Sequence, residues 1–127
     1  MQCPFCLPMV DLSQVILKNA HCMFIQTSEP VLVGSGVIIP IQHRETLFDL
    51  TADEWQATFT LLNQIKTMLD KQYASDGYNI GWNCGEAGGQ EVFHAHLHVI
   101  PRFKDEPFAG KGIRYWIKQD ANKRQRT

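Results

Sequence analysis

One segment restricts the possible folds of this chain more than any other, the stretch from Thr51 to Tyr73. It opens with a capping-box pattern, in which Thr51 supplies the N-cap hydroxyl and Glu54 the carboxylate three residues later. Large apolar residues then recur every three or four positions, as they do along one face of an amphipathic helix: Trp55, Phe59, Leu62, Ile65, Leu69 and Tyr73. We therefore predict one long helix over residues 51–73 and place this apolar stripe in the core.

Short apolar runs rich in β-branched residues surround this helix. They lie at residues 15–17, 22–25, 31–39, 78–82 and 92–101, with turn residues between several of them. A further apolar cluster at residues 113–117 indicates a short docked segment. Strands arranged around a single helix predict an α+β fold, an antiparallel sheet of about five strands with one long helix packed on it.

The length of 127 residues corresponds to one domain. We expect a core over about residues 3–103 and a basic tail over 104–127, frayed from residue 118. Residues 1–101 hold four of the 12 Lys and Arg residues and ten of the 13 Asp and Glu residues, so the other eight and three lie in residues 102–127. The excess of basic residues in this tail is compatible with a nearby anionic ligand and equally with a solvated chain end.

Several classes of protein are excluded by the pattern of apolar residues. No apolar run approaches the ~18–20 residues of a membrane span. The first residues lack the basic and apolar regions of a signal peptide, so we expect a cytoplasmic, reducing location. In that setting the Cys3-x-x-Cys6 pair indicates a metal or redox role and not a disulfide. Cys22 and Cys84 are expected to be small buried residues.

Three of the five histidines alternate with apolar residues at His94, His96 and His98. On a strand these side chains share one face, ~6.5–7 Å apart, while the intervening apolar residues anchor the other face. Burying three imidazoles without partners would cost too much free energy for a packing role. The alternation therefore predicts a functional cluster.

A phosphate or a metal ion could occupy such a cluster. Gly85, Gly88 and Gly89 precede the histidines and would let backbone N–H groups approach an anion, while Asn83 and Gln90 offer amide donors. This neighbourhood favours phosphate. A single catalytic metal held by all three histidines is disfavoured, because they would span ~13 Å along a strand.

The segment from Gly88 to Arg102 resembles the signature of the histidine triad family, His-Φ-His-Φ-His-Φ-Φ with Φ apolar. The resemblance covers about residues 3–103, and the motifs of this chain are similar in order and spacing to those of bacterial members. Its other parts are Cys3-Pro4-Phe5-Cys6, Ile39-Pro40-Ile41-Gln42-His43, the helix that follows Leu47-Phe48-Asp49-Leu50, and Tyr78-Asn79-Ile80.

This resemblance implies a nucleotide hydrolase or nucleotidyl transferase. Its substrate would be a nucleoside phosphoramidate or a dinucleoside polyphosphate, attacked at the α-phosphate to give a nucleotidyl-histidine. His96 would be the nucleophile, and His98 would orient the site and hydrogen-bond near the phosphate. Asn83, Gly89 and Gln90 would hold phosphate oxygens. The alternative is a nucleotide-binding, zinc-stabilised interaction protein with little turnover.

A second constellation is formed by Cys3, Cys6, His43 and His94, the composition of a tetrahedral Cys₂His₂ zinc site. Resemblance to zinc-bearing members implies that His94 is a ligand and that the zinc is structural. A free Cys-x-x-Cys at the terminus, with His43 on the surface, is the alternative. The resemblance also implies a homodimer, and no nucleic-acid partner is expected.

Three positions depart from the family pattern. Ser35 stands where many members carry a further histidine, and Thr27 where many carry an aspartate that holds the ribose. Glu91 replaces a residue near the phosphate that is often Ser or Thr. These differences bear on the leaving group and the substrate, and leave His96 in place.

Overall fold

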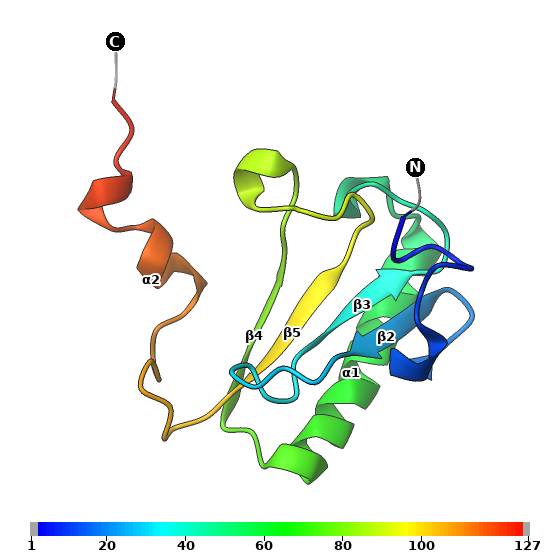
Figure 1. The fold of residues 1–127 in the computed structure, drawn as a ribbon, viewed down its shortest axis with the longest axis horizontal. Helices are drawn as coiled ribbons and strands as arrows, with labels where there is room; N and C mark the ends of the chain where they lie inside the picture. The colour runs from blue at the N-terminus through cyan, green and yellow to red at the C-terminus, as the bar shows by residue number, and fades with distance from the viewer. Residues whose placement is uncertain (1–2, 126–127) are drawn as a thin grey trace.

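The computed structural model describes residues 3–125 and contains one five-stranded sheet with a long helix on one face (Figure 1). The strands are β1 (Val15–Lys18), β2 (Cys22–Gln26), β3 (Gly36–Pro40), β4 (Gly77–Trp82) and β5 (Leu97–Arg102). The helices are α1 (Ala52–Tyr73) and the short α2 (Ile113–Ile117). Single 3₁₀ turns lie at Leu12–Gln14, Leu47–Asp49, Glu86–Gly88 and Asp120–Asn122.

The strands follow the spatial order β1-β2-β3-β5-β4, and every neighbouring pair is antiparallel. β5 is therefore a central strand, with Leu97 opposite Ile38 of β3 and His98 opposite Gly81 of β4. The predicted α+β architecture, with five antiparallel strands and one long helix, is confirmed. This order places His98, the last histidine of the motif, in the middle of the sheet.

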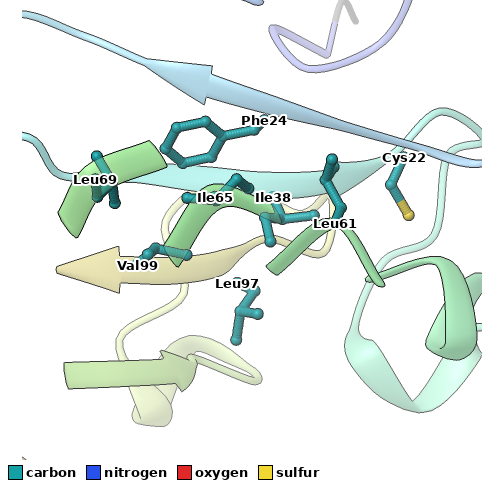
Figure 2. Packing of buried hydrophobic residues seen from close by; sticks show 8 residues of the cluster. All are labelled: Cys22, Phe24, Ile38, Leu61, Ile65, Leu69, Leu97 and Val99. Carbon is teal, nitrogen blue, oxygen red and sulfur yellow. The ribbon is translucent and has the colours of Figure 1, made fainter. Parts of the chain in front are cut away.

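Helix α1 begins where the capping box predicts. The Thr51 hydroxyl accepts from the Glu54 backbone N–H, and the Glu54 carboxylate accepts from the Thr51 N–H. Its buried face packs on the sheet and closes the main core, drawn in Figure 2: Cys22, Phe24, Ile38, Leu61, Ile65, Leu69, Leu97 and Val99. Helix α1 and the neighbouring strands β3 and β4 thus hold the backbone of β5 in place.

The predicted apolar stripe of α1 is wrong only in the first two turns of the helix, where the buried face is shifted by one residue. Trp55 and Phe59 are 45% and 62% exposed, whereas Glu54 and Thr58 are buried. Their burial is tolerated because both are hydrogen-bonded: Thr58 donates to the Glu54 carbonyl over 2.8 Å, and Glu54 is held by Arg44. Ile65 and Leu69 lie in the core, as predicted.

Two strand predictions also need correction. Val31–Val33 form an exposed bend and β3 begins only at Gly36, because the glycines there allow the chain to turn. The strand predicted over residues 92–101 begins at Leu97, so His94 and His96 precede it. The segment 113–117 is helical, and Ile113 lies against Gly81 of β4, although Ile113, Trp116 and Ile117 are more than half exposed.

The C-terminal segment with α2 extends from the β4 side of the sheet, away from the N-terminal segment (Figure 1). Among the helices of residues 3–125, none combines the length with the apolar surface that a bilayer crossing requires.

Gly36 provides a stability test of the packing between β2 and β3. A Cβ on this residue would meet the Ile25 carbonyl oxygen and, at 2.7 Å, the ring of Phe24. We expect Gly36→Ala to lower the free energy of unfolding by about 1–3 kcal/mol, the usual cost of overpacking. Gly77→Ala is the matched control, because nothing lies within 4 Å of its Cβ position. Urea denaturation measures both variants, and equal stabilities would contradict the packing.

Candidate active site and metal centre

The three histidines occupy different environments in the structure. His94 is fully buried, His96 is nearly so, and His98 on β5 is half-buried. His96 and His98 lie side by side with ring centroids 4.9 Å apart. His94 faces a group of cysteines instead, so the motif serves two neighbouring sites.

The orientation of His96 is set by a backbone carbonyl. Its Nδ1 lies 2.8 Å from the carbonyl oxygen of His94. A carbonyl can only accept, so Nδ1 carries the proton, and Nε2 of the neutral ring keeps a free lone pair. The Phe5 ring packs edge-on against His96 with centroids 5.2 Å apart. The ring of His96 is thus held in one orientation, with Nε2 as the nitrogen that is free to react.

His98 lines a cavity of about 330 Å³ on the sheet face, together with Asn79, Gly81, Trp82, Asn83, Ile100 and Ile113. Its Nε2 lies 3.5 Å from the side-chain amide nitrogen of Asn83. Burial lowers the pKa of His98, and the neighbouring imidazole of His96 lowers it further. A neutral His98 next to an amide donor therefore borders a hollow of a size that admits a small ligand.

The glycine-rich loop differs from the cradle of free amides that its composition predicts. The N–H groups of Gly88 and Gln90 donate to the Gly85 carbonyl, and that of Gly89 donates to Glu86. Gly85 and Gly89 adopt φ angles of 77° and 93°, which only glycine adopts without strain. The glycines therefore serve a tight turn whose amides are engaged within the loop.

Gln90 fixes this loop from inside the protein. Its side-chain oxygen accepts from the Gly85 N–H over 2.9 Å, and its amide nitrogen donates to the Glu45 and Val92 carbonyls over 2.7 and 3.1 Å. Both amide hydrogens are thus in use, and the residue is only 3% exposed. Asn83 is the exposed amide at this end of the site, 3.7 Å from the Cβ position of Gly89.

The four predicted metal ligands come together. One donor atom from each of Cys3, Cys6, His43 and His94 lies within 4.8 Å of every other. Nδ1 of His94 is 3.4 and 3.5 Å from the two sulfurs, and Nδ1 of His43 is 3.2 Å from Cys6. Nε2 of His94 donates to the Pro40 carbonyl over 2.8 Å, which turns Nδ1 toward the thiols. These residues are positioned to hold a metal ion.

The chemistry of this donor set fits a soft divalent cation. Burial lowers the pKa of His94, which favours the neutral, coordinating ring. Burial and the neighbouring Cys3 raise the pKa of the Cys6 thiol, so two adjacent thiolates require a cation. Two sulfurs and two imidazole nitrogens form a tetrahedral set that zinc accepts.

Several residues that shape the site escaped sequence reasoning. Phe5 packs on His96, and the Arg44 carbonyl accepts from the Ala95 N–H over 2.7 Å. The only signal was proximity, because Phe5 lies within the Cys-x-x-Cys pair and Arg44 follows His43. Thr27 lines a separate hollow of about 370 Å³ whose lining includes none of the three histidines.

Comparisons with known proteins agree with this geometry. The HIT domain family matches residues 10–105. An uncharacterized HIT-like protein of Borreliella burgdorferi is 37% identical over 84 residues, covering 65% of this chain and 60% of that protein. An asymmetrical bis(5'-nucleosyl)-tetraphosphatase of Schizosaccharomyces pombe is 33% identical over 92 residues, 72% of this chain. This chain spans only half the length of that hydrolase.

A solved structure adds a metal to the comparison. The zinc-bound histidine triad family protein of Mycobacterium smegmatis aligns with a TM-score of 0.66 at 28% identity, covering 76% of this chain and 70% of that one. The matched family region takes in most of this chain, including all three histidines of the motif. The chain belongs to the HIT domain family.

Proposed function

We propose that this protein hydrolyses or transfers the nucleotidyl group of a nucleoside phosphoramidate or a dinucleoside polyphosphate. The hydrogen bond from His96 Nδ1 to the His94 carbonyl carries the proposal, because it leaves Nε2 free on a ring that lies against His98, which lines the cavity. The similarity to a bis(5'-nucleosyl)-tetraphosphatase supports this class of substrate.

In the first step Nε2 of His96 attacks the α-phosphorus. The bond from phosphorus to the leaving group breaks, and its electron pair departs with that group, which takes up a proton from the solvent where it is an amine. The ring then carries phosphorus on Nε2 and a proton on Nδ1, so it is positively charged. The His94 carbonyl stabilises this charge through the bond it already accepts.

In the second step a water oxygen attacks phosphorus, the bond to Nε2 breaks, and one proton of that water is released to the solvent. The electron pair returns to the ring, which becomes neutral again while the nucleoside monophosphate leaves. Another nucleophile in place of water would give transfer instead of hydrolysis. The same Nδ1 hydrogen bond serves both steps, so the ring does not need to turn between them.

The surrounding residues divide the task of binding phosphate. We assign the exposed Asn83 amide and His98 to the phosphate oxygens. Gly89, with its φ angle of 93°, closes the loop next to Asn83, and Gln90 keeps the loop in place through its internal bonds. Because the backbone N–H groups of the loop are already hydrogen-bonded within it, we assign Asn83 as the main uncharged donor to the phosphate.

The departures at Thr27, Ser35 and Glu91 support one alternative, a nucleotide-binding protein with little turnover. Glu91 is exposed next to the glycine loop, where its carboxylate would repel a highly charged leaving group. A polyphosphate substrate would suffer more from this repulsion than a phosphoramidate. We therefore favour the phosphoramidate between the two substrate classes.

We propose that the metal centre of this protein is a structural zinc site. Zinc at Cys3, Cys6, His43 and His94 would tie the N-terminal segment and the loop before α1 to the histidine motif. All four ligands come from protein, which leaves no open position for a reaction. Two reduced thiols suit a reducing compartment, so the proposal includes a cytoplasmic location.

A homodimer is also part of the proposal. Trp55 and Phe59 project from α1 into solvent, and the Trp55 ring lies 5.9 Å from that of Trp82 on β4. β4 is an outer strand of the sheet, with unpaired backbone groups along one side. A second copy would cover both the apolar residues and this edge.

The nucleophile is tested by His96→Ala, which we expect to reduce turnover to the uncatalysed rate because no other group supplies the Nε2 lone pair. Release of AMP from adenosine 5'-phosphoramidate and from diadenosine tetraphosphate is followed by chromatography. His21→Ala, an exposed histidine in the turn after β1, is the control and should keep full activity. Turnover by the His96 variant would contradict the proposal. Wild-type protein that binds AMP in calorimetry but shows no turnover would favour the alternative, a nucleotide-binding protein.

Metal analysis of the purified protein should find one zinc per chain. Cys3→Ser should abolish this zinc, since a serine hydroxyl is a poor zinc ligand at neutral pH. Cys84→Ser is the matched control, because Cys84 lies outside the ligand cluster and should retain the metal. Equal zinc contents in the two variants would place the metal elsewhere.

Association is tested by Phe59→Asp, which puts a charge on the exposed face of α1. Light scattering after size exclusion should show a dimer for wild type and a monomer for this variant, because an interface does not tolerate an unpaired buried charge. Leu12→Asp changes an equally exposed residue beside β1, at the opposite sheet edge, and should stay dimeric. A dimer that survives Phe59→Asp would exclude this interface.

A further inference from the structure

Glu54 is a buried carboxylate that the helix cap alone does not explain. Its side chain is 3% exposed and accepts from the Thr51 N–H over 2.8 Å and from Arg44 Nε over 3.0 and 3.2 Å. Burial raises the pKa of Glu54, but the bonds from Arg44 and Thr51 outweigh it and hold the pKa below its usual value. The carboxylate is therefore charged and tightly paired with Arg44.

The backbone of Arg44 connects this ion pair to the nucleophile. The Arg44 carbonyl accepts from the Ala95 N–H over 2.7 Å. That N–H and the His94 carbonyl belong to the same peptide group, and the His94 carbonyl accepts from His96 Nδ1 over 2.8 Å. Because a peptide group is planar and rigid, fixing its N–H also fixes its carbonyl.

The two hydrogen bonds across this peptide reinforce each other. Donation by the Ala95 N–H to Arg44 polarises the peptide and makes the His94 carbonyl a stronger acceptor. A stronger acceptor gains most when the ring of His96 becomes positively charged, as it does after attack on phosphorus. The stronger hydrogen bond thus stabilises the transition state and the intermediate more than it stabilises the free enzyme.

The neighbouring residue ties the same stretch to the glycine loop. The Glu45 carbonyl accepts from the Gln90 side-chain amide over 2.7 Å. Arg44 and Glu45 therefore hold the peptide before His96 and the loop before the histidine motif at once. The start of α1 is the fixed point for both, through Glu54.

We infer that Glu54 and Arg44 are positioning residues that orient and polarise the His94–Ala95 peptide, and through it the imidazole of His96. Neither side chain touches the substrate in this assignment. The expected effect on rate rests on the proposed function, whereas the effect on the protonation site of His96 does not.

Glu54→Gln and Arg44→Met test the rate. Each should lower kcat on the order of tenfold to a hundredfold, as small misplacements of reacting groups do. The dissociation constant for AMP should stay unchanged, because Asn83 and His98 are intact. Arg44→Lys keeps the positive charge and should recover part of the loss. Lys66→Gln breaks another ion pair of α1, remote from the histidines, and should match wild type.

Nuclear magnetic resonance of ¹⁵N-labelled protein tests the same inference without any reaction. Wild-type His96 should be protonated at Nδ1 alone, and Glu54→Gln should show a mixture of the two neutral tautomers. The inference is overturned if the variants lose thermal stability while kcat and the tautomer of His96 remain those of wild type. A wild type without turnover would remove the proposed function, yet the tautomer measurement would still decide this inference.

Discussion

The hydrogen bond between His96 Nδ1 and the His94 carbonyl is the interaction on which the site depends. It selects one tautomer, points Nε2 away from the backbone and gives the ring a hydrogen-bond acceptor that stabilises a positive charge on the imidazole. No acidic side chain is needed for this, because a peptide carbonyl holds the imidazole as the carboxylate does in a Ser-His-Asp triad. The rest of the fold serves to keep that one peptide in place.

The peptide is held from two directions. On one side His94 belongs to the cluster with Cys3, Cys6 and His43, and its other ring nitrogen is bound to Pro40. On the other side the Arg44 carbonyl receives the Ala95 N–H. A metal ion in the cluster would make the first anchor rigid, and the start of α1 makes the second one rigid.

Much of this arrangement could be predicted from the sequence, because it rests on local patterns. Thr51 and Glu54 mark the start of α1, and the four ligands that gather follow from thiol and imidazole chemistry joined to the family resemblance. The buried face at the start of α1 could not be predicted, because tertiary pairing with Arg44 buries Glu54 while an apolar Trp55 stays exposed. Free loop amides were expected from glycine content, whereas long-range bonds to Gln90 decide how that loop closes.

The most direct test of the account is to look for the covalent intermediate. Wild-type protein would be mixed with excess adenosine 5'-phosphoramidate, quenched in base within one turnover, digested and analysed by mass spectrometry. The account predicts a peptide that carries one added AMP on the imidazole of His96, and that the adduct disappears as free AMP accumulates. AMP formation with no adduct at any time, or an adduct on a different side chain, would contradict it.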